Sequence, residues 1–294
     1  TISGAQFISN TALGNINSAN GASNICYGGG LETDANTILV NTDFISNTVK
    51  CGYDVRGGGL WAGNVAQIQG GAFEGNRTEG TSPSPYGAVY GGGLHADGVL
   101  VITDTRFIRN IGVSPSAYDA PQGGALSGLG NTTITGALFQ ENIAKYGGAA
   151  YFRYTSATIS NTQFISNSTN SIGGAIGQYA ASITVYNSKF IGNSASANGG
   201  ATFALSHSAI GSSNSKFVNT LFVNNTAGDG AVFFNRDSSS LSTIDFQYTT
   251  IAASTLQGSA VALRTGTPSS MSLKDSIVVN YPNALNADVS GRST

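Results

Sequence analysis

The sequence has little charge, and this limits the protein's function. Lys and Arg together number 13, Asp and Glu 15, and the net charge is −2 over 294 residues. With only five Lys and no basic stripe, nothing is available to neutralise a phosphate backbone, so we expect no nucleic-acid partner. No apolar run approaches the ~18 residues that a membrane-spanning helix needs. We therefore expect no membrane span in this chain and no signal peptide before Thr1.

Ligand-type residues are also few. There are two Cys and two His, and no pair has the spacing of a metal site, so no metal or cofactor is predicted. Glycine, in contrast, is abundant at 40 residues. Segments dense in Gly, Ser, Thr and Asn, whose apolar residues alternate with period two, form strands rather than helices.

The Gly residues belong to a repeat. Strong Gly-Gly openings begin at Gly28, Gly57, Gly91, Gly123, Gly147, Gly173 and Gly199, with weaker copies at Asp229 and Gly258. Phe-x-x-Asn tetrads begin at Phe7, Phe44, Phe73, Phe107, Phe139, Phe164, Phe190 and Phe222. The distance from opening to tetrad is 16 residues in four coils and 17 in the next two, which indicates a rigid unit.

Five residues before each tetrad Phe lies a second apolar position. It is occupied by Leu39, Ile68, Ile102, Ile134, Ile159, Val185, Phe217 and, before Ile251, Phe246. A coil of about 24 to 34 residues is too small to bury its own apolar side and must stack on the next coil at about 4.8 Å. The sequence predicts an all-β, right-handed parallel β-helix of about ten coils, in a single domain over residues 1–294.

The tetrad Asn is predicted to lie at a corner and to form a ladder. Stacked side-chain amides satisfy polar groups that water cannot reach. The predicted rungs are Asn10, Asn47, Asn76, Asn110, Asn142, Asn167, Asn193 and Asn225, and Ser254 takes the Asn place in the following coil.

These motifs resemble a known family. Alternating Gly-Gly-Ala-Ile and Phe-x-x-Asn repeats, as in 173–193, are similar to those of the polymorphic outer membrane proteins and related right-handed parallel β-helix proteins. The resemblance covers residues 1 to about 280 and implies a cell-surface passenger used in adhesion or display. Those proteins end in a translocating membrane barrel, and nothing after Asn280 resembles such a barrel. The resemblance therefore extends to the repeat module only.

Cys26 and Cys51 lie in adjacent corner segments, so a disulfide is the favoured prediction and two free thiols the alternative. Four glycosylation sequons occur, but two begin at ladder Asn residues that we expect to be buried. Asn131 and Asn224 are therefore the candidate glycan sites.

The corner segments between ladder and opening change length along the chain. Loops Thr11 to Tyr27, Thr48 to Arg56, Arg77 to Tyr90 and Ile111 to Gln122 are long, and the later ones have three to five residues. The first half of the rod is therefore expected to carry projecting loops. Neither end shows a capping pattern, which favours either a piece of a longer array or ends covered by other subunits.

Candidate site residues lie on the strand face after each opening. Glu32, Asp34, Trp61, His95 and Asp97 would serve a polysaccharide-cleaving or polysaccharide-binding site, with Asp34 and Asp97 nominally about 9.6 Å apart and His95 nearby. An aromatic stripe of Trp61, Tyr151, Tyr179, Phe203 and Phe233 would serve as a partner- or glycan-binding face. If a corner insertion covers these rings or the in/out phase slips by one residue, they are buried instead.

The preferred hypothesis is an extracellular structural or adhesive protein with no catalytic residues. It would be a subunit or passenger segment of a larger cell-surface assembly or filament, associating with itself or other surface proteins. The alternative is a polysaccharide lyase, glycosidase or binding protein that uses Asp34, Asp97 and His95.

Overall fold

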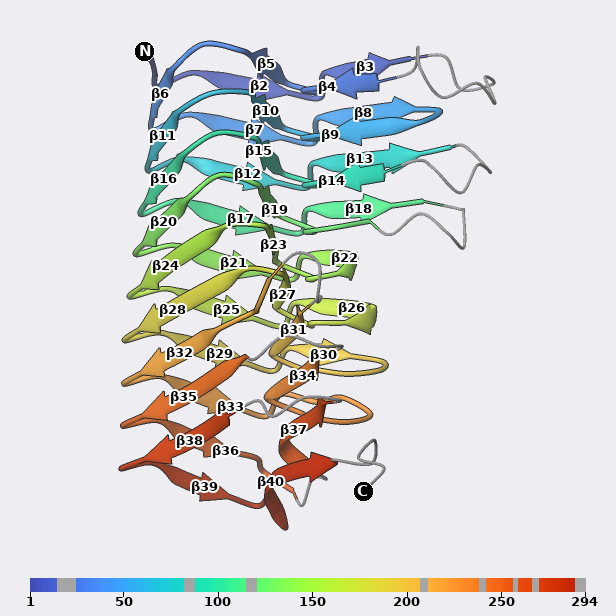
Figure 1. Cartoon of the computed structure of the whole chain (residues 1–294). Coiled ribbons are helices and arrows are strands. Elements are labelled where there is room, and N and C mark those ends of the chain that lie inside the picture. The colour runs from blue at the N-terminus through green and yellow to red at the C-terminus, as the bar shows by residue number, and fades with distance from the viewer. Residues whose placement is uncertain are drawn as a thin grey trace.

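The chain folds into a stack of parallel strands in this computed structural model, whose successive coils form an all-β solenoid (Figure 1). The structure describes residues 1–14, 25–81, 88–114, 121–206, 211–237, 242–255, 259–265 and 270–288. Every strand pair in these ranges is parallel, and none of the described residues is helical. The predicted β-solenoid is confirmed; its right hand and the number of about ten coils stay predictions.

Three ten-stranded sheets form the wall of the solenoid. The first sheet contains β1 (Ile2–Ser3), β6 (Thr37–Val40), β11 (Ala66–Gln69), β16 (Leu100–Thr103), β20 (Thr132–Thr135), β24 (Ser156–Ser160), β28 (Ser182–Tyr186), β32 (Ser215–Val218), β35 (Thr243–Gln247) and β38 (Ser270–Lys274). The second contains β2 (Gln6–Ile8), β7 (Asp43–Ile45), β12 (Ala72–Glu74), β17 (Arg106–Ile108), β21 (Leu138–Gln140), β25 (Gln163–Ile165), β29 (Lys189–Ile191), β33 (Leu221–Val223), β36 (Thr250–Ala252) and β39 (Ile277–Val279). The third contains β5 (Leu31–Thr33), β10 (Leu60–Ala62), β15 (Leu94–Ala96), β19 (Leu126–Gly128), β23 (Ala150–Arg153), β27 (Ile176–Tyr179), β31 (Thr202–Ser206), β34 (Phe233–Asp237), β37 (Ser259–Thr265) and β40 (Asn283–Asp288).

Two smaller sheets project to one side and form what we call the arm (Figure 1). The outgoing strands are β3 (Thr11–Leu13), β8 (Thr48–Cys51), β13 (Arg77–Gly80), β18 (Ile111–Val113), β22 (Ile143–Tyr146), β26 (Ser168–Ile172) and β30 (Ser194–Ala195). The returning strands are β4 (Ile25–Tyr27), β9 (Asp54–Arg56) and β14 (Ala88–Tyr90).

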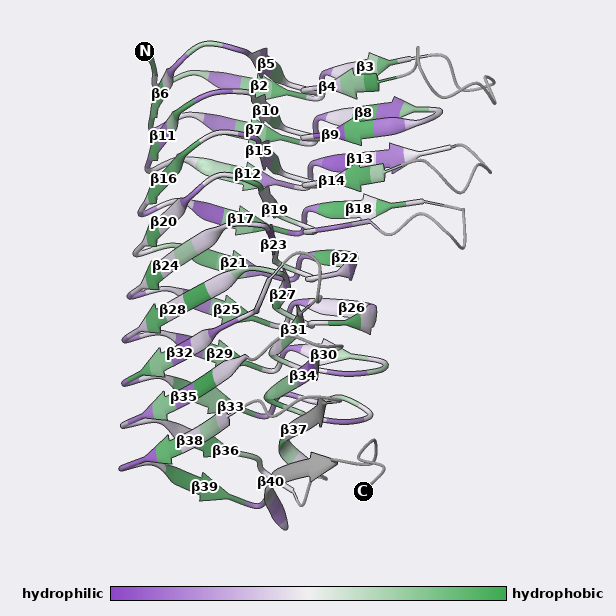
Figure 2. Ribbon diagram, viewed as in Figure 1, coloured by the Kyte–Doolittle hydropathy of each residue, from purple (hydrophilic) through white to green (hydrophobic). Residues whose placement is uncertain are grey.

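The core lies inside the three long sheets, where side chains of like kind stack coil upon coil. Tetrad Phe rings from Phe7 to Phe222 stack nearly parallel, with neighbouring centroids 4.6 to 4.9 Å apart. The predicted second apolar column from Leu39 to Phe246 is buried as well. Hydrophobic and hydrophilic residues alternate along the strands (Figure 2), which places one set inside and the other in solvent.

The asparagine ladder is continuous from Asn10 to Asn225. In each step the Nδ2 of one Asn donates to the Oδ1 of the next at 2.9 or 3.0 Å, and Asn47 through Asn225 are fully buried. That Oδ1 also accepts from the backbone N–H of the preceding Asn, as Asn142 does from Asn110 at 2.9 Å. At Ser254 the ladder stops, and the backbone N–H of Ser254 donates instead to Asn224 Oδ1.

The long corner segments project from the first half of the rod as predicted, but the described parts of them are largely strands and not loops (Figure 1). Val49, Cys51, Val55 and Val89 form a second hydrophobic cluster between outgoing and returning strands. Much of the long corner segments is therefore strand with a core of its own. Residues 15–24, 82–87 and 115–120 of the predicted loops lie outside the described residues.

A disulfide joins Cys26 and Cys51 in the arm, with Cα atoms 6.0 Å apart. It links the second corner strand pair to the first, and Cys51 is fully buried. The link therefore closes most of one coil, ending four residues before Val55, which pairs in register with Cys26.

Candidate functional site

The candidate site lies at the inside corner where the arm meets the third sheet. The chain turns there at each Gly-Gly opening. Gly57 has φ +65°, and a Cβ on it would lie 2.0 Å from the carbonyl oxygen of Leu60, so only glycine fits this turn. Because the turn is so tight, the residue just before it faces the outward side chains of the third sheet.

Two columns of side chains line this corner, set by the parallel register. The corner column, immediately before each turn, is Tyr27, Arg56, Tyr90, Gln122, Tyr146, Ile172, Asn198 and Asp229. The face column, on the third sheet, is Glu32, Trp61, His95, Ser127, Tyr151, Gly177, Phe203 and Phe234.

The aromatic stripe is mostly covered, which corrects the expectation of a broad exposed aromatic face. Trp61, Tyr151 and Phe203 are each less than a tenth exposed. Tyr27 packs on Trp61 with ring centroids 4.4 Å apart, and the corner column continues this cover along the solenoid. The alternative prediction, that corner residues cover the rings, describes this face better.

Phe233 is a second correction, because it lies in the main core and is fully buried. Phe234 takes the expected place, pairing in register with Phe203 and stacking on it at 5.7 Å. Tyr179 lies one row further out, in register with Arg153 and Leu205, and the next residue in that row is Arg236.

A polar cluster surrounds Asp97 in the face's N-terminal half. Its carboxylate accepts a hydrogen bond from Trp61 Nε1 at 3.0 Å and from His95 Nε2 at 3.1 Å. Arg56 contacts the same carboxylate at 3.3 Å and pairs with Asp54 at 2.7 Å. The predicted residues Trp61, His95 and Asp97 are thus brought together, with Arg56 and Asp54 as partners that the sequence analysis missed.

The cluster holds Asp97 as an anion. Its partial burial favours the neutral form, but the hydrogen bonds from His95 and Trp61 and the charge of Arg56 outweigh burial, so the pKa of Asp97 lies below its ordinary value. Complete burial lowers the pKa of His95 despite its hydrogen bond to Asp97. Since a carboxylate only accepts, neutral His95 carries its proton on Nε2, and its buried Nδ1 has no hydrogen-bond partner among the described residues.

The low pKa of His95 predicts loss of stability in acid. Below the unfolded value of about 6.5, the unfolded chain binds a proton that folded His95 does not, so stability falls by up to about 1.4 kcal/mol per pH unit until the folded pKa is reached. Urea unfolding of wild type and His95→Gln between pH 7.5 and 5 measures this, and the slope is expected to be smaller in the variant. His207→Gln, which removes the other His, is the control; an equal loss of slope there contradicts the assignment.

Asp34 and Glu32 do not join the cluster. Both are exposed, and Asp34 lies two coils from Asp97, in register through Gly63.

The candidate glycan sites Asn131 and Asn224 are also exposed, whereas the sequons at Asn76 and Asn167 start at buried ladder positions.

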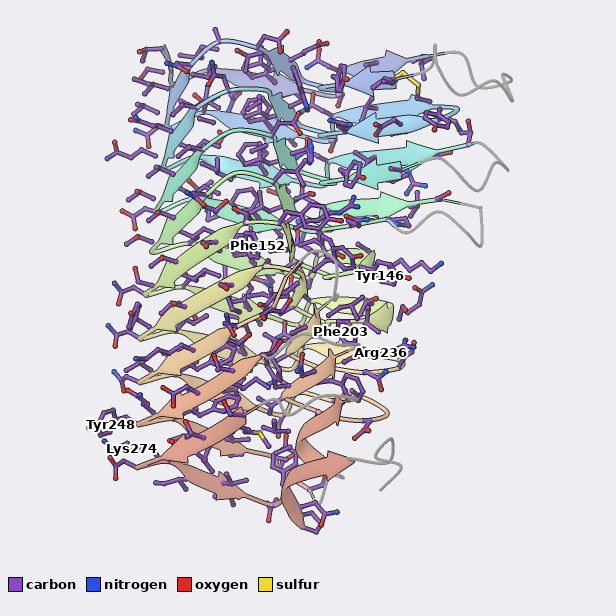
Figure 3. All side chains as sticks on the ribbon, in the orientation of Figure 1. Tyr146, Phe152, Phe203, Arg236, Tyr248 and Lys274 are labelled. Atoms are coloured by element: carbon purple, nitrogen blue, oxygen red, sulfur yellow. A yellow bond between two sulfur atoms is a disulfide. The ribbon has the colours of Figure 1, made fainter. Side chains whose placement is uncertain are left out.

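A cleft of about 350 Å³ opens further along the same corner. Figure 3 shows Phe203 and Arg236 close together beside the corner, with Tyr146 nearer the N-terminal half. Apart from Ser171 in β26, the lining residues come from both columns and the row outside them: Gln122, Tyr146, Tyr151, Arg153, Ile172, Tyr179, Asn198, Phe203, Leu205 and Arg236.

In the ranges that the structure describes, no three His, Cys, Asp or Glu side chains are grouped so as to hold a metal ion. The same ranges contain no helix long and apolar enough to cross a membrane. No protein-family model, curated protein or solved structure matches the chain.

Proposed function

We propose that this chain is an extracellular structural or adhesive module, a segment of a larger cell-surface assembly, that binds ligands at its inside corner and does not cleave them. The observation that carries the proposal is the state of Asp97. The carboxylate of Asp97 is already engaged by Arg56, Trp61 and His95 and its pKa is lowered, so it is a poor proton donor. Glycoside cleavage needs a second carboxylate to act with it, and Glu32 and Asp34 both lie outside the cluster.

Several features support a role outside the cell. The disulfide between Cys26 and Cys51 suits an oxidising compartment. Stacked Phe rings and the asparagine ladder suit a stiff spacer, and the arm widens one side of the rod in its first half. Kinship with the polymorphic outer membrane proteins, which the repeats resemble, is part of this proposal. So is association with other surface proteins or with further copies of this chain.

Incubation with a polysaccharide panel tests binding against cleavage. The wild type is expected to release no reducing ends and no unsaturated sugar above background, and Asp97→Asn is expected to behave in the same way. Cleavage by the wild type that is lost in Asp97→Asn or Asp34→Asn overturns the proposal and establishes the enzyme alternative.

Electron microscopy of the wild type at several concentrations tests assembly, for which rods joined in regular arrays are expected.

A further inference from the structure

The cleft at the inside corner has an aromatic lining that suits a ring-shaped ligand. Tyr151 and Phe203 are nearly buried in its floor, and the side chains of Tyr146 and Tyr179 lie beside them. Gly177 lies between Tyr151 and Phe203 in register. A Cβ there would lie 2.7 Å from the Tyr151 ring, so the Tyr151 ring lies over Gly177 and only glycine leaves room for it in the floor.

The charge around this cleft has one sign. Arg153 and Arg236 both line it, and no Asp or Glu is among the lining residues. The Arg153 guanidinium lies over the rings of Tyr154 and Tyr179, at 4.7 and 5.5 Å from their centroids. Arg236 is exposed and forms no ion pair within the described ranges.

The two arginines lie in the same outward row. Arg153, Tyr179, Leu205 and Arg236 occupy successive strands, so the outer two are three strand spacings, or about 14 Å, apart. A ligand that runs along the solenoid can therefore meet both cations and the Tyr179 side chain between them. A single small anion can meet only one.

An unpaired acceptor lies at the N-terminal end of the cleft. Gln122 lines it, and its Oε1 is buried without a hydrogen-bond partner among the described residues. A buried carbonyl oxygen of this kind costs free energy unless a donor reaches it. A ligand hydroxyl is such a donor.

We propose that this cleft binds an acidic oligosaccharide, whose carboxylates pair with Arg153 and Arg236 and whose sugar rings pack on Tyr146 and Tyr179. Carboxylate and guanidinium form charge-assisted hydrogen bonds, and aromatic rings pack well on the apolar faces of sugars. A neutral sugar leaves the two cations unused. The assignment rests on the proposed function, in that the module binds and does not cleave.

Calorimetric titration with trigalacturonate tests the assignment. Wild type is expected to bind it, and Arg236→Gln is expected to weaken binding at least tenfold. Arg106→Gln removes one exposed positive charge from the second sheet and is the matched control, expected to stay within twofold. The methyl ester of trigalacturonate, which lacks the charges, is expected to bind at least tenfold more weakly than the acid.

The outcomes separate this proposal from the proposed function. Absent binding in the wild type, or equal losses in Arg236→Gln and Arg106→Gln, overturns the acidic-sugar assignment, and tighter binding of a sulfated trisaccharide overturns the assignment of carboxylates as the paired groups. Each of these results leaves the non-catalytic module standing. Cleavage of trigalacturonate, followed by mass spectrometry, overturns the proposed function itself. Tyr179→Ala gives a second test: its affinity for trigalacturonate is expected to fall at least fivefold, while its circular dichroism spectrum is unchanged.

Discussion

Replacing Asn142 by alanine is expected to lower the free energy of unfolding by about 3 to 5 kcal/mol. The Asn142 side chain takes part in four buried hydrogen bonds, two from Asn110 and one each to Asn167 and the carbonyl of Phe107. Alanine leaves the backbone N–H of Asn110 and the carbonyl of Phe107 buried without these partners. Each unsatisfied group costs about 1 to 3 kcal/mol.

Urea unfolding followed by circular dichroism measures the loss, and hydrogen exchange shows whether it is confined to neighbouring coils. Asn131→Ala is the matched control, because Asn131 is an exposed asparagine outside the ladder. Its stability is expected to change by less than about 0.5 kcal/mol. If both variants unfold at the same urea concentration, the ladder does not stabilise the fold as argued.

Removing the disulfide is expected to have a comparable effect. The bond joins residues 25 positions apart, and the loop-closure entropy it removes from the unfolded chain corresponds to about 3 to 4 kcal/mol. Cys51 also packs in the arm's small core with Val49, Val55 and Val89, so Cys51→Ala adds a packing loss. The effect should be concentrated in the N-terminal coils, because the bond lies there.

The measurement is thermal unfolding of the wild type with and without a thiol reductant. The double variant Cys26→Ala/Cys51→Ala is the control: it should unfold at lower temperature than the oxidised wild type and be insensitive to reductant. Limited proteolysis should then cut first within the arm strands β3, β4, β8 and β9. An oxidised wild type as labile as its reduced form contradicts the prediction.

The core could be predicted from sequence because one physical constraint repeats. Each coil must bury the same face at the same spacing, so Phe139 and Ile134 have equivalents in every neighbouring coil, and the Asn tetrad position follows from the same count. The Gly-Gly openings carry the second constraint, since a side chain at Gly57 would collide with backbone.

Counting residues from the opening assigned the wrong outward residue in one coil. Taking Asp229 as its opening placed Phe233 on the outer face, but the backbone register pairs Asp229 with Asn198, so the turn begins at Gly230. Ala231 replaces the second Gly of the pair and hides this shift. A slip of one residue moves a side chain to the opposite face of a strand, which is why Phe233 and Phe234 exchanged roles.

The arm and its partners were missed for a different reason. Strands of three or four residues, such as Asp54–Arg56, give too little alternation to separate strand from loop. The sequence does contain a signal for the arm. In four coils the residue just before the opening is a large one, Tyr27, Arg56, Tyr90 or Tyr146, and such a recurrence is unusual for a solvent-exposed loop. That position supplies Arg56 to Asp97 and Tyr146 to the cleft.

The asparagine ladder also gives the rod an electrical direction. Every side-chain carbonyl from Asn47 to Asn225 points back toward the coil before it, so the amide dipoles are parallel and reinforce one another. Reversing one amide would set two acceptors or two donors against each other. Because the ladder stops at Ser254, before the C-terminal strands β37 to β40, this column belongs to each rod alone and makes the two ends of the rod electrically different without joining one rod to the next.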